Sequence, residues 1–286
     1  MKKAILVPAI CIAAATVLAA CGGPSEAEER YNDGVDAQEA GRLDEAVALY
    51  TEAIELDPEL AAAYNNRSGA YLDLGRFDEA LADANKVIEL NPELVEAYVI
   101  RSGAYLDLGR FDEALADANK AIELEPANVN LLAQAYVIRS AAYAGLGRFD
   151  EALEDATKTI ELEPANVNVL AQAYANRSFA RGDQYEEALA DDDAAIELNP
   201  TDVNVLATAY VNRAFDLAAL GRFDEALEDA TKAIELDPAN MNVLAQAYAN
   251  RSEVYESLGR FDEALEDATK ACDLGLDEAC EITAAN

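Results

Sequence analysis

The side chains with reactive chemistry in this sequence are four cysteines, Cys11, Cys21, Cys272 and Cys280. The chain contains no histidine, so it lacks the side chain that most often moves protons at neutral pH and most often binds metal ions. No phosphate-binding glycine loop is present, and no nucleophile stands beside a recognisable base. We therefore predict no catalytic residue, no metal site and no cofactor, and we do not expect an enzyme.

The chemistry expected of Cys21 depends on the residues before it. Lys2 and Lys3 precede an apolar run over residues 4–18, which is shorter than the roughly 20 residues of a membrane-spanning helix. This pattern predicts a secretory signal peptide over residues 1–20, and Cys11 would be lost with it. The sequence Leu18-Ala19-Ala20-Cys21 resembles the lipobox of bacterial lipoproteins. The resemblance implies cleavage before Cys21, lipidation of its thiol, and a short tether over residues 21–26.

The residue after Cys21 bears on location. It is Gly22 and not aspartate, which by analogy with the sorting rules of lipoproteins favours the outer membrane, with the chain facing the periplasm. The alternative is an ordinary cleaved signal peptide in which the cysteine is incidental.

An internal repeat defines the elements that would position any binding site. The sequence Gly-Arg-Phe-Asp-Glu-Ala begins at Gly75, Gly109, Gly147, Gly221 and Gly259, and variants of it begin at Gly41 and Gly182. Each unit predicts two helices. The glycine ends the first helix in a left-handed C-cap, the acidic pair lies at the positive end of the second helix, and a proline ends that helix.

Two further positions recur in the repeats. One is always alanine, at Ala46, Ala80, Ala114, Ala152, Ala188, Ala226 and Ala264, and another is tyrosine, at Tyr64, Tyr98, Tyr136, Tyr174, Tyr210 and Tyr248. At these positions the chain resembles the tetratricopeptide repeat family. The resemblance implies an all-α, right-handed superhelical α-solenoid of seven helical hairpins. Their boundaries would be about 27–60, 61–94, 95–128, 129–166, 167–202, 203–240 and 241–274, followed by a short capping helix over residues 275–286.

The later repeats depart from the usual period. The spacing from Tyr64 to Tyr98 is 34 residues, whereas that from Tyr98 to Tyr136 is 38, and four residues are about one helical turn. Side chains that can cap a helix follow the prolines, at Asn128, Asn166, Asp202 and Asn240. We therefore expect these first helices to begin one turn early. The unit around Gly182 is two residues short, which predicts a tighter turn or a shorter first helix.

A charge pair recurs with the repeat. Arginine occupies one position of the first helix, at Arg67, Arg101, Arg139, Arg177, Arg213 and Arg251, and aspartate one position of the second, at Asp83, Asp117, Asp155, Asp191, Asp229 and Asp267. The first repeat lacks both members, which favours pairing within each repeat. The alternative is an arginine ladder that binds a ligand.

The C-terminal segment is similar to the cysteine-bridged Sel1-like helical repeats, through Ala271-Cys272-Asp273-Leu274-Gly275 and Ala279-Cys280. An exported chain enters an oxidising compartment. The resemblance implies a Cys272–Cys280 disulfide that ties a short final helix to the last repeat. Two buried thiols are the alternative.

In the tetratricopeptide repeat family the first helices line a groove for peptides or partner helices. Carried over by position, the groove residues here would be Asn32, Asn65, Asn66, Val99, Ile100, Leu106, Val137, Ile138, Asn176, Asn212 and Asn250. This set predicts an apolar centre, with asparagines at the flanks that could bond a peptide backbone. The alternative is that superhelical curvature buries the apolar members.

The net charge limits the partners. The chain has 56 acidic and 21 basic residues, a formal charge of −35, so it repels nucleic acid and anionic membrane surfaces. We predict a lipid-anchored scaffold or adaptor of a bacterial cell envelope, with protein partners that have basic flanks. The membrane would be reached only through the lipid. The alternative is a structural protein whose acidic surface binds cations or wall polymers. The acid excess also suggests adaptation to salt.

Overall fold

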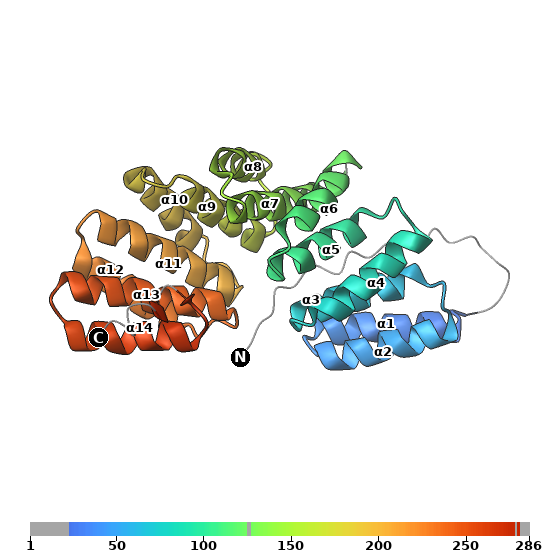
Figure 1. Cartoon of the computed structure of the whole chain (residues 1–286). Coiled ribbons are helices and arrows are strands. Elements are labelled where there is room, and N and C mark those ends of the chain that lie inside the picture. Colours follow the sequence, from blue (N-terminus) through green and yellow to red (C-terminus); the bar gives the residue numbers. More distant parts are fainter. Residues whose placement is uncertain (1–22, 125–126, 278, 281–286) are drawn as a thin grey trace. The chain divides into compact units, whose positions relative to one another are not determined.

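The computed structural model describes residues 23–124, 127–277 and 279–280, and within these ranges it contains fourteen α-helices and no strand (Figure 1). This confirms an all-α fold built from consecutive helical hairpins. The predicted signal peptide, the lipidation site Cys21 and residues 281–286 of the predicted cap lie outside the described residues. Among the helices that are described, none is both long and apolar enough to cross a membrane.

The chain forms two compact units that divide between Leu146 and Gly147. Unit 1 contains α1 (Glu26–Glu39), α2 (Leu43–Leu56), α3 (Ala61–Asp73), α4 (Phe77–Leu90), α5 (Val95–Asp107), α6 (Phe111–Glu123) and α7 (Val129–Gly145). Unit 2 contains α8 (Phe149–Glu161), α9 (Val167–Ala180), α10 (Tyr185–Glu197), α11 (Val203–Ala219), α12 (Phe223–Glu235), α13 (Met241–Ser257) and α14 (Phe261–Asp273). Odd-numbered helices are the first helices of the repeats and even-numbered helices are the second.

The turn inside each hairpin follows from its glycine. Gly75 has a φ of +71°, a left-handed conformation that an L side chain would strain. Its N–H donates to the carbonyl of Leu72 at 2.9 Å, and the N–H of Arg76 donates to the carbonyl of Tyr71 at 2.8 Å. These two bonds form a Schellman motif, which satisfies carbonyls at the end of α3 and lets the chain reverse. The predicted left-handed C-cap is confirmed.

The first helices of the later repeats begin one turn early, as predicted. The side chains of Asn128, Asn166, Asp202 and Asn240 each accept a hydrogen bond from a backbone N–H of the first turn that follows. Helices α7, α11 and α13 therefore have 17 residues, whereas α3 and α5 have 13. Helix α9 has only 14 residues, which confirms the shortened repeat around Gly182.

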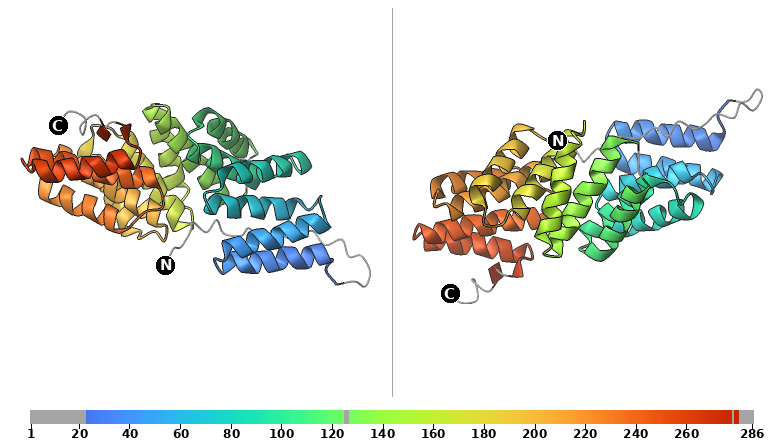
Figure 2. Two further views of the ribbon diagram at one scale, coloured as in Figure 1. Left: turned by 60° about the horizontal axis from the view of Figure 1, so that its bottom comes forward. Right: turned by 90° about the horizontal axis from the view of Figure 1, so that it is seen from above.

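Alanines let the helices cross closely. The recurring alanines Ala46, Ala80, Ala114, Ala152, Ala188, Ala226 and Ala264 are all buried. Within unit 1 α5 contacts both α3 and α7, and within unit 2 α11 contacts both α9 and α13. Figure 2 shows the helices of each unit stacked in chain order. The second helices that the structure describes pack chiefly against first helices. Each unit is therefore curved with its first helices on the inside, and side chains on those helices decide what the inner face offers.

Candidate protein-binding surface

Three of the six asparagines predicted to bind a partner instead join neighbouring first helices, namely Asn66, Asn212 and Asn250. The side-chain amide of Asn212 donates to the carbonyl of Ala175 at 3.0 Å, and that of Asn250 donates to the carbonyl of Val211 at 2.9 Å. The oxygen of Asn250 accepts from Gln246 at 2.9 Å. Because both ends of this amide are already bonded, Asn250 has a structural role.

The remaining predicted asparagines vary in exposure. The amide of Asn66 donates to the hydroxyl of Tyr31 at 3.1 Å, and the oxygen of Asn176 accepts from Gln172 at 2.8 Å. Asn65 and Asn176 are buried, Asn66 and Asn212 are half-buried, and Asn32 on α1 is exposed. Asn32 is thus the one fully exposed asparagine of the predicted set.

The predicted apolar centre is mostly closed. Val99, Ile100 and Val137 are buried, so the expectation that they form an open surface is wrong. For Val99 the physical reason is the extra turn of α7, whose Leu131 packs in one cluster with it. Burial of the apolar members was the alternative interpretation of the sequence. Leu106 and Ile138 remain half-buried.

The repeated charge pair is architectural. Arg101 donates from Nε and Nη2 to the two carboxylate oxygens of Asp117, both at 2.6 Å, and from Nη1 to Asn85 of the preceding repeat at 2.6 Å. The guanidinium also lies 5.7 Å from the ring centroid of Tyr98. These hydrogen bonds to Asp117 raise the pKa of Arg101 above its usual range. Three of the five N–H donors of Arg101 are therefore used within the protein, which leaves few for a ligand.

The same two-pronged pairing within a repeat joins Arg67 to Asp83, Arg177 to Asp191, Arg213 to Asp229 and Arg251 to Asp267. The prediction of pairing within each repeat is confirmed for these pairs. Since one member lies on each helix of a hairpin, the pairs fix the angle between the two helices.

Unit 2 has exposed aromatic side chains that were not predicted from the sequence. Phe179 on α9 and Phe215 on α11 are 55% and 49% exposed. Phe179 makes an edge-to-face contact with Phe149 at a centroid distance of 6.0 Å, and Phe215 makes one with Tyr185 at 6.4 Å. The equivalent residues in earlier repeats are Val35, Gly69, Gly103 and Ala141. A comparison of this single position across the repeats would have revealed the change from small to aromatic.

A pocket of about 200 Å³ adjoins Phe215. It is lined by Phe215, Ala218, Ala219, Phe223, Glu253, Val254 and Ser257. It lies among α11, α12 and α13, and most of its lining residues are apolar, so it can accept an apolar side chain of a partner. We call Phe149, Phe179, Tyr185, Phe215 and this pocket the aromatic surface.

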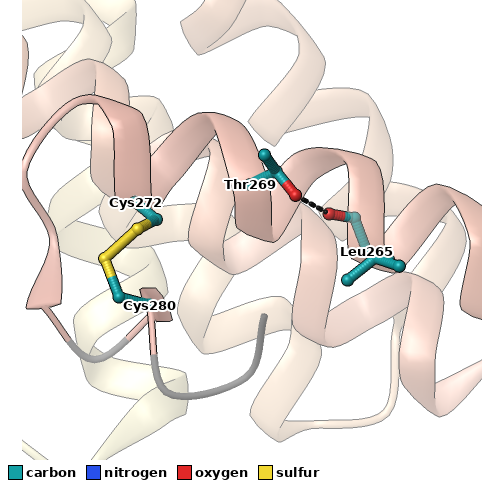
Figure 3. Close-up of a disulfide and its surroundings, with 4 residues drawn as sticks. All are labelled: Leu265, Thr269, Cys272 and Cys280. Carbon is teal, nitrogen blue, oxygen red and sulfur yellow. Dashed lines mark hydrogen bonds between the residues drawn. A yellow bond between two sulfur atoms is a disulfide. The ribbon is translucent and has the colours of Figure 1, made fainter. Parts of the chain in front are cut away.

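The predicted disulfide is present. Cys272 at the end of α14 is bonded to Cys280, with their Cα atoms 4.8 Å apart (Figure 3). Residues 277, 279 and 280 are helical, and Ala279 is buried. The bond therefore holds this short segment against the last repeat.

Comparisons with known proteins define the family. Models described as tetratricopeptide repeat match residues 31–94, 67–129 and 103–166, and another with the same description matches residues 205–276. The chain belongs to the tetratricopeptide repeat family. Members of this family are helical scaffolds for protein–protein interaction and are typically not catalytic.

Several solved structures have a similar fold. A tetratricopeptide repeat protein from Parabacteroides merdae is 21% identical, with a TM-score of 0.64 over 90% of this chain and 97% of that one. A chain of the APC/C hetero-tetramer Cut9–Hcn1 is 16% identical, with a TM-score of 0.72 over 88% of this chain and 47% of that one. PilW, a type IV pilus biogenesis factor, is 18% identical, with a TM-score of 0.62 over 78% and 98%.

Proposed function

We propose that this chain is a protein-interaction scaffold, anchored by lipid in a bacterial cell envelope, and that its partner binds the aromatic surface of unit 2. The exposure of Phe179 and Phe215 carries this proposal. Both lie on first helices, at a position where repeats two to four have glycine or alanine. Exposed, clustered apolar groups are costly in water and commonly mark interaction sites, and aromatic side chains contribute strongly to interface energy.

The chemistry of the surface suggests the chemistry of the partner. An apolar side chain of the partner would fill the pocket beside Phe215, and its neighbours would be basic. The reason is the formal charge of −35 on the chain, together with the position of Glu253 in the pocket wall. Complementary charge raises the rate of association and excludes acidic competitors. An extended or helical segment could meet both requirements.

The experiment that tests this surface uses the double variant Phe179→Glu/Phe215→Glu. The partner is first captured on the wild-type chain in the native host and identified, and its affinity is then measured with purified proteins. We expect the double variant to lose about tenfold or more in affinity, equivalent to about 1.4 kcal/mol, with unchanged helix content.

Leu56→Glu is the matched control, because Leu56 is 48% exposed at the end of the second helix α2. It should bind like the wild type. If the double variant folds and retains the wild-type affinity, the aromatic surface is not the binding site.

The lipid anchor rests on the sequence Leu18-Ala19-Ala20-Cys21. Two or three acyl chains, at about 0.8 kcal/mol for each buried methylene, would hold the chain stably in a membrane. The mass of the protein from native membranes should correspond to a chain that begins at an acylated Cys21, and Cys21→Ser should abolish acylation. A mature chain that starts elsewhere, or a Cys21 without lipid, would refute the anchor and leave the binding surface untouched.

A further inference from the structure

The contact between α10 and α11 contains two buried carboxyl groups at positions where other repeats have small apolar side chains. Asp192 on α10 is 0% exposed and Asp216 on α11 is 4% exposed. The position of Asp192 is alanine in five other second helices, at Ala84, Ala118, Ala156, Ala230 and Ala268. The position of Asp216 is apolar in five other first helices, at Ala70, Ala104, Ala142, Ala180 and Val254, and its acidic counterpart in α1, Asp36, is exposed.

A buried hydroxyl completes the cluster. Ser178 on α9 lies beside both carboxyl groups and affects their ionisation. Its counterparts Ser68, Ser102 and Ser252 donate to backbone carbonyls of the following second helix. The hydroxyl of Ser178 makes no such bond, and neither oxygen of Asp192 nor Oδ2 of Asp216 has a hydrogen-bond partner. Apart from the neighbouring hydroxyl of Ser178, these enclosed oxygens make no hydrogen bond to a donor. Such burial strongly disfavours two ionised carboxylates.

The cations nearby are engaged with other carboxylates. Arg177 on α9 and Arg181, which directly follows α9, bind Asp191 at 2.5 and 2.8 Å. Arg213 on α11 binds Asp229 and Asp193 at 2.6 and 2.7 Å. The cations on the other packed helices are also paired, since Lys232 on α12 binds Glu228 and Asp229, and Arg251 on α13 binds Asp267. The other charged groups on the helices around the pair are acidic, namely Glu186, Glu187, Glu197, Asp224, Glu225, Glu235, Glu253 and Glu256. A proton is therefore the available means of neutralising the pair.

We propose that Asp192 and Asp216 share a proton at neutral pH, and that loss of this proton loosens the contact between α10 and α11. With the proton present, one carboxyl group can donate a hydrogen bond to the other, and Ser178 supplies a second donor. Without it, two negative charges face each other in a site that excludes water. The fold thus contains a pH-sensitive contact that the five repeats with alanine at the position of Asp192 lack.

The raised pKa values of the pair determine how the stability of the fold changes with pH. Burial raises the pKa of Asp216 to about 7 and raises the pKa of Asp192 well above its ordinary value, and the negative charge of Asp216 adds to the effect on Asp192. An unfolded aspartate has a pKa of about 3.9. The folded state therefore binds protons that the unfolded state has released. Stability from this pair is fully present below about pH 4 and is lost as the pH rises through about 7.

The proton can be observed directly by carbon NMR of the full chain labelled at the aspartate carboxyl carbons. We expect wild-type signals that titrate near or above neutral pH, and these should be missing from the double variant Asp192→Ala/Asp216→Ala. Both substitutions introduce a residue that other repeats have there, so the variant should fold. In the single variant Asp216→Ala, Asp192 should titrate at lower pH than in the wild type, because the negative charge of Asp216 raises the pKa of Asp192. If all wild-type signals titrate near the ordinary value of about 3.9, the proposal is overturned.

The conformational consequence needs a second measurement, hydrogen exchange of α10 and α11 by mass spectrometry. The exchange rate of the wild type relative to the double variant should rise by about tenfold or more between about pH 6 and about pH 9, and the ratio removes the intrinsic effect of pH on exchange. Glu187→Gln is the control, because Glu187 is exposed on the same helix, and it should follow the wild type. A ratio that stays constant with pH would show that ionisation of the pair does not loosen the contact.

Discussion

At the scale of single residues, the side chains best suited to binding serve mainly to hold the repeats together. Arg101 links both helices of its own hairpin and the preceding repeat, and Asn212 and Asn250 join neighbouring first helices. The sequence predicted the arginine–aspartate pairs, because both members are missing from the first repeat. It did not predict the asparagine bonds, because each depends on the distance between two neighbouring first helices. The bonded residues are 37 positions apart in the chain for Asn212 and 39 for Asn250.

The charge pairs can be tested by comparing a buried carboxylate with an exposed one. Asp117→Ala leaves Arg101 mostly buried without its partner, and we expect a loss of about 3 kcal/mol in the free energy of unfolding, near the low end for buried pairs since some solvent reaches the arginine. Glu113→Ala removes the exposed partner of Arg110 and should change stability little. Urea unfolding followed by circular dichroism measures both. Equal effects would contradict a structural role for the buried pair.

Ile100 gives a second test at this scale. Ile100→Arg would place a charge in a buried site, so it should destabilise the fold strongly, whereas a position on an open groove would tolerate the change. The thermal midpoint of unfolding measures the difference, with Asn32→Arg as the control on an exposed position. An Ile100→Arg chain as stable as the control would mean that this side chain is accessible.

At the scale of elements, the four inserted residues do more than lengthen a helix. They were predicted to add a turn, and they do so in α7, α11 and α13. The structure adds a bond between repeats, since Oδ1 of Asn168 accepts from the N–H of Thr201 at 2.9 Å and Oδ1 of Asn204 accepts from that of Asn240 at 3.0 Å. No sequence pattern shows this bond, because it joins the starts of successive first helices that pack side by side.

The caps of the longer helices contribute measurable stability. Asn240→Ala removes the side-chain acceptor at the start of α13, and we expect a loss of about 1 kcal/mol and faster hydrogen exchange in the first turn. Asn242→Ala, at an exposed site in the same turn, should have little effect on either. If both variants behave alike, the cap does not stabilise the added turn.

The disulfide should act locally on the last repeat. Cys272→Ser/Cys280→Ser opens a short loop whose closure is worth about 2.5 kcal/mol in the chain-entropy model. We expect faster hydrogen exchange in α14 and in residues 277–280, and little change in unit 1. Unchanged exchange in α14 would mean that packing alone holds this segment.

At the scale of the whole molecule, charge is the dominant feature. A formal charge of −35 causes self-repulsion that opposes a compact state, and salt screens such repulsion beyond about 10 Å at 0.1 M. The thermal midpoint should therefore rise when sodium chloride is added. Potassium chloride should give the same rise, since the effect is one of screening. A midpoint that stays level or falls would contradict net repulsion and would count against adaptation to salt.

The fold could be predicted from the sequence far better than the binding surface. Seven copies of one motif fix the helix pairs, the turns and the caps. The exposure of a side chain such as Val99 or Phe215 depends instead on which side chains of the neighbouring helices cover it. The inserted turn covers Val99 in unit 1, whereas Phe215 stays exposed in unit 2.

A protein partner that binds the aromatic surface of unit 2 would lie within reach of photoreactive groups placed there. Site-specific photocrosslinking in the native host measures this contact. A photoreactive phenylalanine analogue replaces Phe215 in one strain and Leu56 in another. We expect one discrete crosslinked partner from position 215 and none from position 56. The same analogue in place of Phe179 should crosslink the same partner. Crosslinks from position 56 to the same protein, or no protein adduct from positions 179 and 215, would contradict binding at the aromatic surface.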